Sequence, residues 1–426
     1  MYRHEQHRGP HTLSTLGWMK LGLLILTALI FYSLMASPSA SNAPMDQAEV
    51  ETLHHVVQNY VQEKQLGSSF GGFFLNWETQ EPTALFTDWV QGHRQSLEKR
   101  STAARHLRIR GVNFSEQHLR SQVAQITDGL KAGQFLSVRF VTTELQNNRV
   151  RVDIGKGLPT TASDEALIER TYDAADVYQL ESATFTKNVA TIPSKDCVDQ
   201  NDVTSCVKPN RNNHAPPWYA GSGGNACTQG FALNGLDSFR GYMLSAGHCY
   251  PTVGMEVVNA GGYRIGRAVA TENNSNRDAA VIELDQESQT GPYTWASYPA
   301  TRRVVNTDLG HEAVGYTRCM SGASSLHWCG PLLDTNATTV STTDEGAGVP
   351  HENMRVVRAG SAANPRPGDS GAPWWHPLNG EAYASGVHTG RYQRHDTVEG
   401  LTYTYSFGVY TYIGNAFVAS TSLRTN

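Results

Sequence analysis

The sequence has 426 residues, which is enough for two or three domains. Charged residues make up 17% of the chain and the formal net charge is −5, so no basic field points to a nucleic-acid partner. The six cysteines all lie between residues 197 and 329, in three neighbouring pairs without C-x-x-C spacing. This pattern disfavours zinc-ribbon and thioredoxin chemistry and predicts three local disulfides in an oxidising compartment, and we expect no metal or cofactor site.

Residues 1–43 have the layout of an export signal. Basic residues up to Lys20 precede an apolar run over 21–34, and small residues follow as far as Ala43. A basic start, a short apolar core and a small-residue exit predict a secretory signal peptide that is removed, which places the product outside the cell. The alternative is an uncleaved membrane anchor with the rest of the chain outside, because a span needs about 20 residues and the stretch 16–36 supplies them.

Residues 44–190 contain no cysteine. Apolar residues at helical spacing and alternating residues predict two helices, two strands and a further short helix that ends near Tyr172. The helices are expected over 48–64 and 114–130, and the strands over 135–141 and 149–154. We therefore expect a small α+β domain, with no cluster of catalytic residues and no metal-ligand spacing among its histidines.

Residues 191–222 have the composition of a linker, with four prolines among Asn, Asp and Lys. Cys197 and Cys206 lie inside it. They either close a small loop with each other or pair with other cysteines, and spacing does not decide between these.

Residues 223–426 are rich in short apolar segments separated by turn residues, which predicts an all-β domain of the sandwich or barrel kind. The expected strands are 231–233, 241–245, 256–258, 279–284, 354–357 and 407–412.

The segment Gly368-Asp-Ser-Gly371 carries the strongest chemical signal in this domain. Glycine permits a sharp, exposed turn around Ser370, and the N–H groups of Gly368 and Ser370 can then point at one oxyanion. A serine hydroxyl is a poor nucleophile unless a histidine takes its proton and a carboxylate orients that histidine.

Two other segments supply those partners. His248 directly follows the predicted strand 241–245, beside Cys249, and Asp278 opens the predicted strand 279–284. The order His248, Asp278, Ser370 is one of the few known orders of a Ser-His-Asp triad. We therefore predict that these three residues are catalytic.

The motifs resemble those of the chymotrypsin-like serine proteases, and specifically the bacterial streptogrisin and α-lytic-protease branch. The resemblance covers roughly residues 215–426, with Ala372 where a second glycine is usual and Ser245 where threonine is usual. The matching segments are Ser245-Ala-Gly-His-Cys249, Arg277-Asp-Ala-Ala-Val-Ile282 and Pro367-Gly-Asp-Ser-Gly-Ala-Pro373.

This resemblance implies a catalytic domain, residues 223–426, of two antiparallel six-stranded β-barrels with the site between them. It implies that residues 44–190 are a pro-domain, which assists folding and blocks the site until it is cut off; the alternative is an accessory domain that stays attached. It also implies disulfides within the pairs Cys227–Cys249 and Cys319–Cys329.

A buried carboxylate next to the nucleophile needs a cation. The bacterial branch carries an arginine for this role at the position of Arg318, so the resemblance implies an ion pair between Arg318 and Asp369.

The resemblance also points to the residues that select the substrate. Asn364, six residues before the nucleophile, would lie at the base of the pocket, where it disfavours a preference for Lys or Arg. His388, Thr389 and Gly390 lie in a segment that resembles the pocket-lining strand. In glutamate-specific members a histidine at this place binds the substrate carboxylate, which implies cleavage after Glu or Asp; the alternative is a buried histidine without a charge role. An acidic preference would allow self-processing after Glu181 or after an aspartate at 196, 199 or 202.

The predicted function is that of a secreted, monomeric serine endopeptidase that acts on proteins or peptides and is made as a precursor with its own inhibitory pro-region. The alternatives are a membrane-tethered protease and a non-catalytic binding module on a protease fold.

Overall fold

The chain divides into two compact units, Met1–Met45 and Asp46–Asn426, and the predicted signal segment 1–43 lies outside the described residues. Among the residues described, no helix is long and apolar enough to cross a membrane. Only the backbone is described for 196–197, 206–207, 397–398, 401 and 421. With these, the computed structural model describes residues 45–158, 160–187, 218–224, 227–235, 240–259, 262–285, 290–296, 300–309, 312–341, 350–360, 364–398, 401–416 and 421–425.

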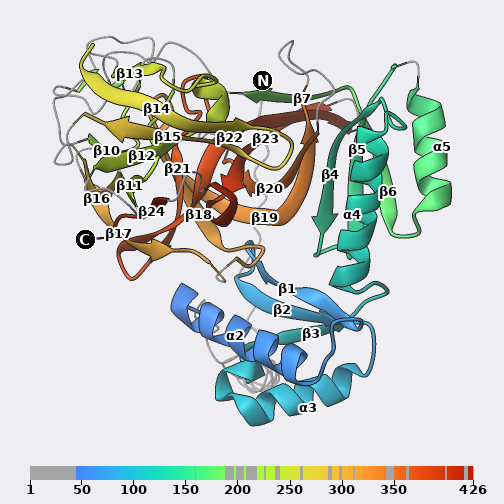
Figure 1. Cartoon of the computed structure of the whole chain (residues 1–426). Helices are drawn as coiled ribbons and strands as arrows, with labels where there is room; N and C mark the ends of the chain where they lie inside the picture. The colour runs from blue at the N-terminus through green and yellow to red at the C-terminus, as the bar shows by residue number, and fades with distance from the viewer. Residues whose placement is uncertain are drawn as a thin grey trace, which may run out of the picture. The chain divides into compact units, whose positions relative to one another are not determined.

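The first described region, up to residue 111, combines helices with a small sheet (Figure 1). The first helix begins at Asp46, whose carboxylate accepts the N–H of Glu49 and so satisfies a free donor of the first turn. The three strands are antiparallel between the first two and parallel between the last two. In chain order the elements are α2 (Gln47–Glu63), β1 (Phe70–Asn76), β2 (Glu81–Phe86), α3 (Val90–Arg100), η1 (Thr102–His106) and β3 (Arg108–Gly111).

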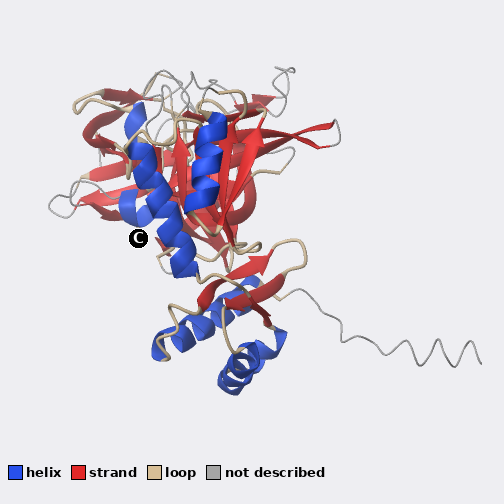
Figure 2. Cartoon of the chain, turned by 90° about the vertical axis from the view of Figure 1, so that its right-hand side faces the viewer, coloured by secondary structure: helices blue, strands red, loops and turns tan. Residues whose placement is uncertain are grey.

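The next region, up to residue 187, places two helices beside a sheet (Figures 1 and 2). Its long helix begins at Ser115, whose hydroxyl accepts the N–H of His118, and it buries Leu119, Val123 and Ile126 against the strands. The elements are α4 (Glu116–Lys131), β4 (Val138–Glu144), β5 (Arg149–Gly155), α5 (Thr161–Thr171), β6 (Ala175–Leu180) and β7 (Ser182–Lys187).

A six-stranded antiparallel sheet contains Asp278, and His248 lies just after one of its strands. Its order is β13-β14-β15-β12-β11-β24, and no pairing joins β13 to β24 among the described residues. Both strands at its centre, β12 and β15, are buried over consecutive residues, and their side chains contribute to a core that includes Leu244, Val281 and Leu284. The strands are β11 (Ala232–Gly235), β12 (Gly241–Ser245), β13 (Glu256–Val258), β14 (Arg264–Asn273), β15 (Asp278–Leu284) and β24 (Thr421–Leu423).

A second, 13-stranded sheet contains strands β4–β7, β10 and β16–β23. Six of its strands, β18, β19, β20, β23, β22 and β21, pair in that order and return to β18, so they form a closed antiparallel ring. The earlier region joins this sheet twice, through β4 on β19 and β7 on β22. The later elements are β10 (Trp218–Ala220), η3 (Gly247–Cys249), β16 (Thr290–Trp295), β17 (Thr301–Thr307), β18 (Thr317–Gly322), β19 (Leu326–Val340), β20 (Pro350–Arg358), β21 (Pro373–Leu378), β22 (Glu381–Val398), β23 (Leu401–Tyr412) and α6 (Ile413–Ala416).

The predicted fold class, an all-β region preceded by a small α+β region, is confirmed. The closed ring of six strands corresponds to one of the two predicted barrels, and β4 and β7 add strands from residues 44–190 to its sheet. Closure of the other sheet into a second barrel stays a prediction. In the predicted linker, β8 (Asp196–Cys197) and β9 (Cys206–Val207) pair with Cys197 opposite Cys206. Their side chains are outside the described residues, so that disulfide stays a prediction.

Candidate active site

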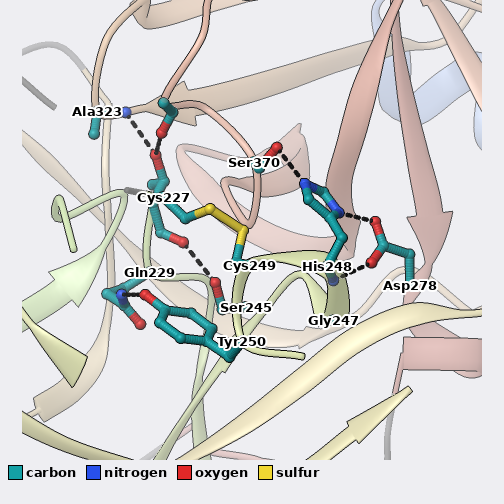
Figure 3. The surroundings of a disulfide bond; sticks show 12 residues. Cys227, Gln229, Ser245, Gly247, His248, Cys249, Tyr250, Asp278, Ala323 and Ser370 are labelled. Carbon is teal, nitrogen blue, oxygen red and sulfur yellow. Dashed lines mark hydrogen bonds and ion pairs between the residues drawn. A yellow bond between two sulfur atoms is a disulfide. The ribbon is translucent and has the colours of Figure 1, made fainter. Parts of the chain in front are cut away.

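The structure brings His248, Asp278 and Ser370 together, and the three side chains lie in a row (Figure 3). The Nδ1 atom of His248 lies 2.6 Å from Oδ2 of Asp278, and its Nε2 atom lies 2.8 Å from Oγ of Ser370. The second carboxylate oxygen of Asp278 accepts the backbone N–H of His248 at 2.9 Å. With Nδ1–H donating to the carboxylate, Nε2 is the ring nitrogen that is free to take the serine proton.

The residues on either side of His248, Gly247 and Cys249, fix its position. It belongs to the short helix η3, which follows β12 directly, and the neighbouring Cys249 is bonded to Cys227. A Cβ on Gly247 would lie 2.0 Å from the carbonyl oxygen of Glu272, so only glycine allows this close approach to β14. The motif around the histidine therefore fixes the position of the ring.

Asp278 is the first residue of β15, and none of its surface is exposed. Burial alone would raise its pKa, but the charge and the hydrogen bonds of His248 outweigh burial and lower the pKa to about 2. The carboxylate is therefore ionised at neutral pH and stabilises the cationic form of the imidazole.

Ser370 lies on a sharp turn that only glycines permit. Gly368 and Gly371 have φ angles of +97° and +87°, and a Cβ on Gly371 would lie 2.2 Å from the carbonyl oxygen of Thr228. Thr228 fastens the turn, because its N–H donates to the carbonyl of Ser370 and its hydroxyl to that of Gly368.

The predicted oxyanion donors are the N–H groups of Gly368 and Ser370. Among the residues that the structure describes, neither N–H donates a hydrogen bond. Backbone donors in this arrangement can hold an oxyanion that forms next to Oγ, and this role stays a prediction.

The predicted ion pair between Arg318 and Asp369 is wrong. Arg318 pairs with Asp308 at 2.7 Å, and both side chains are fully buried. Asp369 instead accepts three backbone N–H groups, those of Arg366, Ser324 and Ser325. Three N–H donors can hold a buried carboxylate without an arginine, although burial still raises the pKa of Asp369.

His388, Thr389 and Gly390 lie together on β22, immediately behind the nucleophile turn. The N–H of Gly371 donates to the carbonyl of His388, and the N–H of His388 donates to the carbonyl of Ala372. The ring of His388 is fully buried and accepts the indole N–H of Trp374 at Nδ1, at 3.2 Å. Burial, with a contribution from His248, lowers its pKa to about 3, so the ring is neutral at pH 7.

Asn364 comes just before Pro365, whose carbonyl accepts a hydrogen bond from Arg391 on β22. It lines a cavity of about 660 Å³ together with Trp77, Arg358 and Tyr405, and His388, Thr389 and Gly390 are not among the described residues that line this cavity. The described lining of this cavity therefore contains the predicted pocket base and not the predicted pocket wall, and their joint role in substrate selection stays a prediction.

Both disulfides implied for the catalytic region are present: Cys227–Cys249 and Cys319–Cys329. Each pair lies near a histidine, His248 or His327, but a sulfur in a disulfide is no thiolate ligand.

One feature of the site was missed in the sequence. Strand β7 lies along β22 in antiparallel register, with Lys187 opposite Gly390, and Lys187 Nζ donates to Asn273 Oδ1 at 3.0 Å. Ser370 is fully buried, and the side chain of His248 is 4% exposed. The alternation of Ala183 and Phe185 with polar residues was the available signal for this strand.

Comparison with known proteins gives partial matches. No protein-family model and no curated protein matches the sequence. Protease A of Thermobifida fusca is 21% identical, over 49% of this chain and 98% of its own, with a TM-score of 0.38. A protease of Nocardiopsis gives the same figures. A glutamic acid specific serine protease, which uses a histidine triad in substrate binding, is 20% identical over 46% of this chain and 90% of its own, with a TM-score of 0.35.

Proposed function

We propose that the chain is a serine endopeptidase in which Ser370 attacks the substrate carbonyl. The observation that carries the proposal is the continuous row of hydrogen bonds from Asp278 through His248 to Ser370. His248 Nε2 takes the proton of Ser370 as the C–O bond forms and gives it to the leaving amine, which leaves an acyl-enzyme. Water then attacks the acyl carbon while His248 takes its proton. The proton returns to Oγ of Ser370 as the acyl bond breaks, which frees the acid product. The N–H groups of Gly368 and Ser370 stabilise the oxyanion in both steps.

The test is hydrolysis of casein by the exported product of the full chain. The wild type is expected to be active and Ser370→Ala inactive. Ser324→Ala is the matched control, because its hydroxyl is buried without a hydrogen-bond partner among the described residues. Equal hydrolysis by wild type and Ser370→Ala would reject the proposal and favour a non-catalytic binding module.

We further propose that residues 44–190 are an inhibitory pro-region of a secreted precursor. The support is the position of β7, which covers the edge of β22 beside a fully buried Ser370. Lys187 is the end of β7 beside the site, and Glu181 precedes the strand, six residues before Lys187. Because Glu181 is that far from the site along the paired strand, we expect the first cut after residue 187 and not after Glu181. N-terminal sequencing of the exported product tests this, and a product that begins at Ser182 would contradict it.

The disulfides of the catalytic region fit an oxidising compartment, and export with removal of residues 1–43 is the proposed route. A membrane-tethered protease is the alternative. Recovery of residues 1–43 in the purified product would support it.

For substrate preference we propose Glu or Asp before the cut, recognised by His388. Because Nδ1 accepts the Trp374 N–H, the proton of the neutral ring is on Nε2, which can donate to a carboxylate. In a peptide library, Trp374→Phe is expected to reduce the preference for Glu over Leu. Trp328→Phe is the matched control, since its indole N–H has no hydrogen-bond partner within the part of the chain that the structure describes. Cleavage mainly after Phe, Leu or Ala by the wild type would reject this preference.

A further inference from the structure

One buried residue, Thr228, contacts the nucleophile turn on both sides of its centre. Thr228 has no exposed surface, and its N–H donates to the carbonyl of Ser370 at 2.7 Å. Its hydroxyl donates to the carbonyl of Gly368 at 2.8 Å. The peptide plane that carries the N–H of Ser370 therefore lies between two planes that Thr228 holds.

The turn needs this support because glycine both permits the turn and loosens it. Gly368 and Gly371 have φ angles of +97° and +87°, and glycine changes its φ angle at little steric cost. Rotation about Gly368 would turn its own N–H and that of Ser370 away from each other. The two predicted oxyanion donors would then no longer point at one place. With its carbonyl bonded to the Thr228 hydroxyl, Gly368 keeps one orientation.

Thr228 is itself fixed to both sheets. Its hydroxyl accepts the N–H of Ala323, which follows β18 of the 13-stranded sheet, at 2.9 Å (Figure 3). Its carbonyl accepts the hydroxyl of Ser245, the last residue of β12 in the six-stranded sheet, at 2.9 Å. Because a hydroxyl has a single hydrogen to donate, the bond from Ala323 leaves that hydrogen for Gly368.

The same part of the chain is connected to the catalytic base. Cys227, which precedes Thr228, is bonded to Cys249, which follows His248. Two adjacent residues therefore hold the turn of Ser370 and the loop of His248, whose Nε2 atom lies 2.8 Å from Oγ of Ser370.

We infer that Thr228 is a positioning residue for the oxyanion donors. Its hydroxyl keeps the N–H groups of Gly368 and Ser370 directed at the oxygen that becomes negative during the reaction. This role rests on the proposed endopeptidase function. Because the oxyanion exists only in the tetrahedral state, the hydroxyl contributes more to that state than to binding of the substrate.

The experiment replaces Thr228 by valine, which removes the hydroxyl at nearly constant volume. All enzymes are matured in trans by a small amount of tagged wild-type enzyme that is then removed. The substrate is the tetrapeptide that the wild type cleaves fastest in a library. The inhibitors are its aldehyde, which adds to Oγ of Ser370 and forms a tetrahedral adduct, and its alcohol, which forms no adduct.

Thr228→Val is expected to lower kcat by about 10- to 100-fold, with KM changed less than about threefold. The inhibition constant of the alcohol divided by that of the aldehyde is expected to fall by a similar factor, because the oxygen of the adduct loses its aligned donors. Thr228→Ser keeps the hydroxyl and is expected to restore both values to within about threefold of the wild type.

Thr290→Val is the matched control. The hydroxyl of Thr290 is buried and donates to the carbonyl of Trp218 at 2.8 Å, between β16 and β10, so the same kind of bond is lost away from the turn. It is expected to lower the free energy of unfolding but to leave the inhibitor ratio within about twofold of the wild type. A wild-type ratio in Thr228→Val, or an equal fall in Thr290→Val, would overturn the inference.

Ser245→Ala gives the answer if Thr228→Val cannot be recovered as folded protein. It frees the carbonyl of Thr228 and leaves the hydroxyl, so a smaller fall in the inhibitor ratio, roughly three- to tenfold, is expected. An unchanged ratio in Ser245→Ala would then overturn the inference. A wild-type enzyme that neither cleaves the peptides nor reacts with a fluorophosphonate would instead reject the proposed function.

Discussion

Replacement of Asp278 by asparagine is expected to inactivate the enzyme through the tautomer of His248. The two oxygens of Asp278 accept both the ring Nδ1–H and the backbone N–H of His248. Asparagine has one carbonyl oxygen and one NH₂ group, so it cannot accept both. If its oxygen takes the backbone N–H, its NH₂ group faces Nδ1 and moves the ring proton to Nε2, where it blocks transfer from Ser370.

The size of the effect follows from this loss. Asp278 is fully buried and its pKa is about 2, so the substitution removes an ionised partner of the imidazolium as well as the correct tautomer. In triads of this kind the change lowers kcat by about 10⁴, which corresponds to about 5 kcal/mol of lost transition-state stabilisation.

The assay is kcat/KM on one peptide substrate, with all variants matured in trans by a small amount of tagged wild-type enzyme that is then removed. Asp285→Asn is the control, because Asp285 follows the same strand but forms an exposed ion pair with Arg264. We expect a drop of about 10⁴ for Asp278→Asn and less than twofold for Asp285→Asn. An Asp278→Asn enzyme with more than a tenth of wild-type activity would refute the assigned role of Asp278.

Three further results are expected. Gly371→Ala should abolish folding or activity, because its Cβ would lie 2.2 Å from a backbone carbonyl and its φ is +87°. Gly360→Ala is the control and should match the wild type in secreted yield, because no described atom lies within 4 Å of its added Cβ. Replacing Cys227 and Cys249 by serine should lower the free energy of unfolding by about 3 kcal/mol for a loop of this length, measured by urea unfolding, and a reducing agent should have no additional effect at this pair. The depressed pKa of Asp278 contributes stability that is present above about pH 4 and is lost as the pH falls towards 2, about 2 kcal/mol in all. Urea unfolding of the inactive precursor at pH 5 and pH 2 should show this loss, and an unchanged loss in Asp278→Asn would contradict its assignment to Asp278.

The parts of the site that the sequence predicts are those encoded by short, local patterns. Strands β12 and β13 have the predicted bounds, 241–245 and 256–258. His248 and Asp278 follow or open such strands, so a strand boundary is enough to place them. The glycines around Ser370 require a turn whatever the rest of the chain does.

The pairing of Arg318 could not be predicted in the same way. Its partner depends on the side of β18 on which its side chain lies, and there it meets Asp308 and also lies 2.9 Å from His376. These residues come from separate segments, so only the packed sheet brings them together. The carboxylate of Asp369 was expected to need a cation, and backbone N–H groups, which every sequence has, bind it instead.

Strand β7 was missed because nothing local requires it. Only Ala183 and Phe185 of its six residues are buried, and its partner strand is about 200 residues later in the chain. An isolated edge strand of this kind is stabilised by pairing and by burial of Phe185, both of which are long-range contacts.

The most direct test of the central claim is to locate a fluorophosphonate label in the exported product by peptide mapping. An activated serine predicts one labelled residue, Ser370, and loss of the label in His248→Ala because the base is gone. Labelling of another residue, or labelling of Ser370 at an unchanged rate in His248→Ala, would contradict the proposal that His248 activates Ser370.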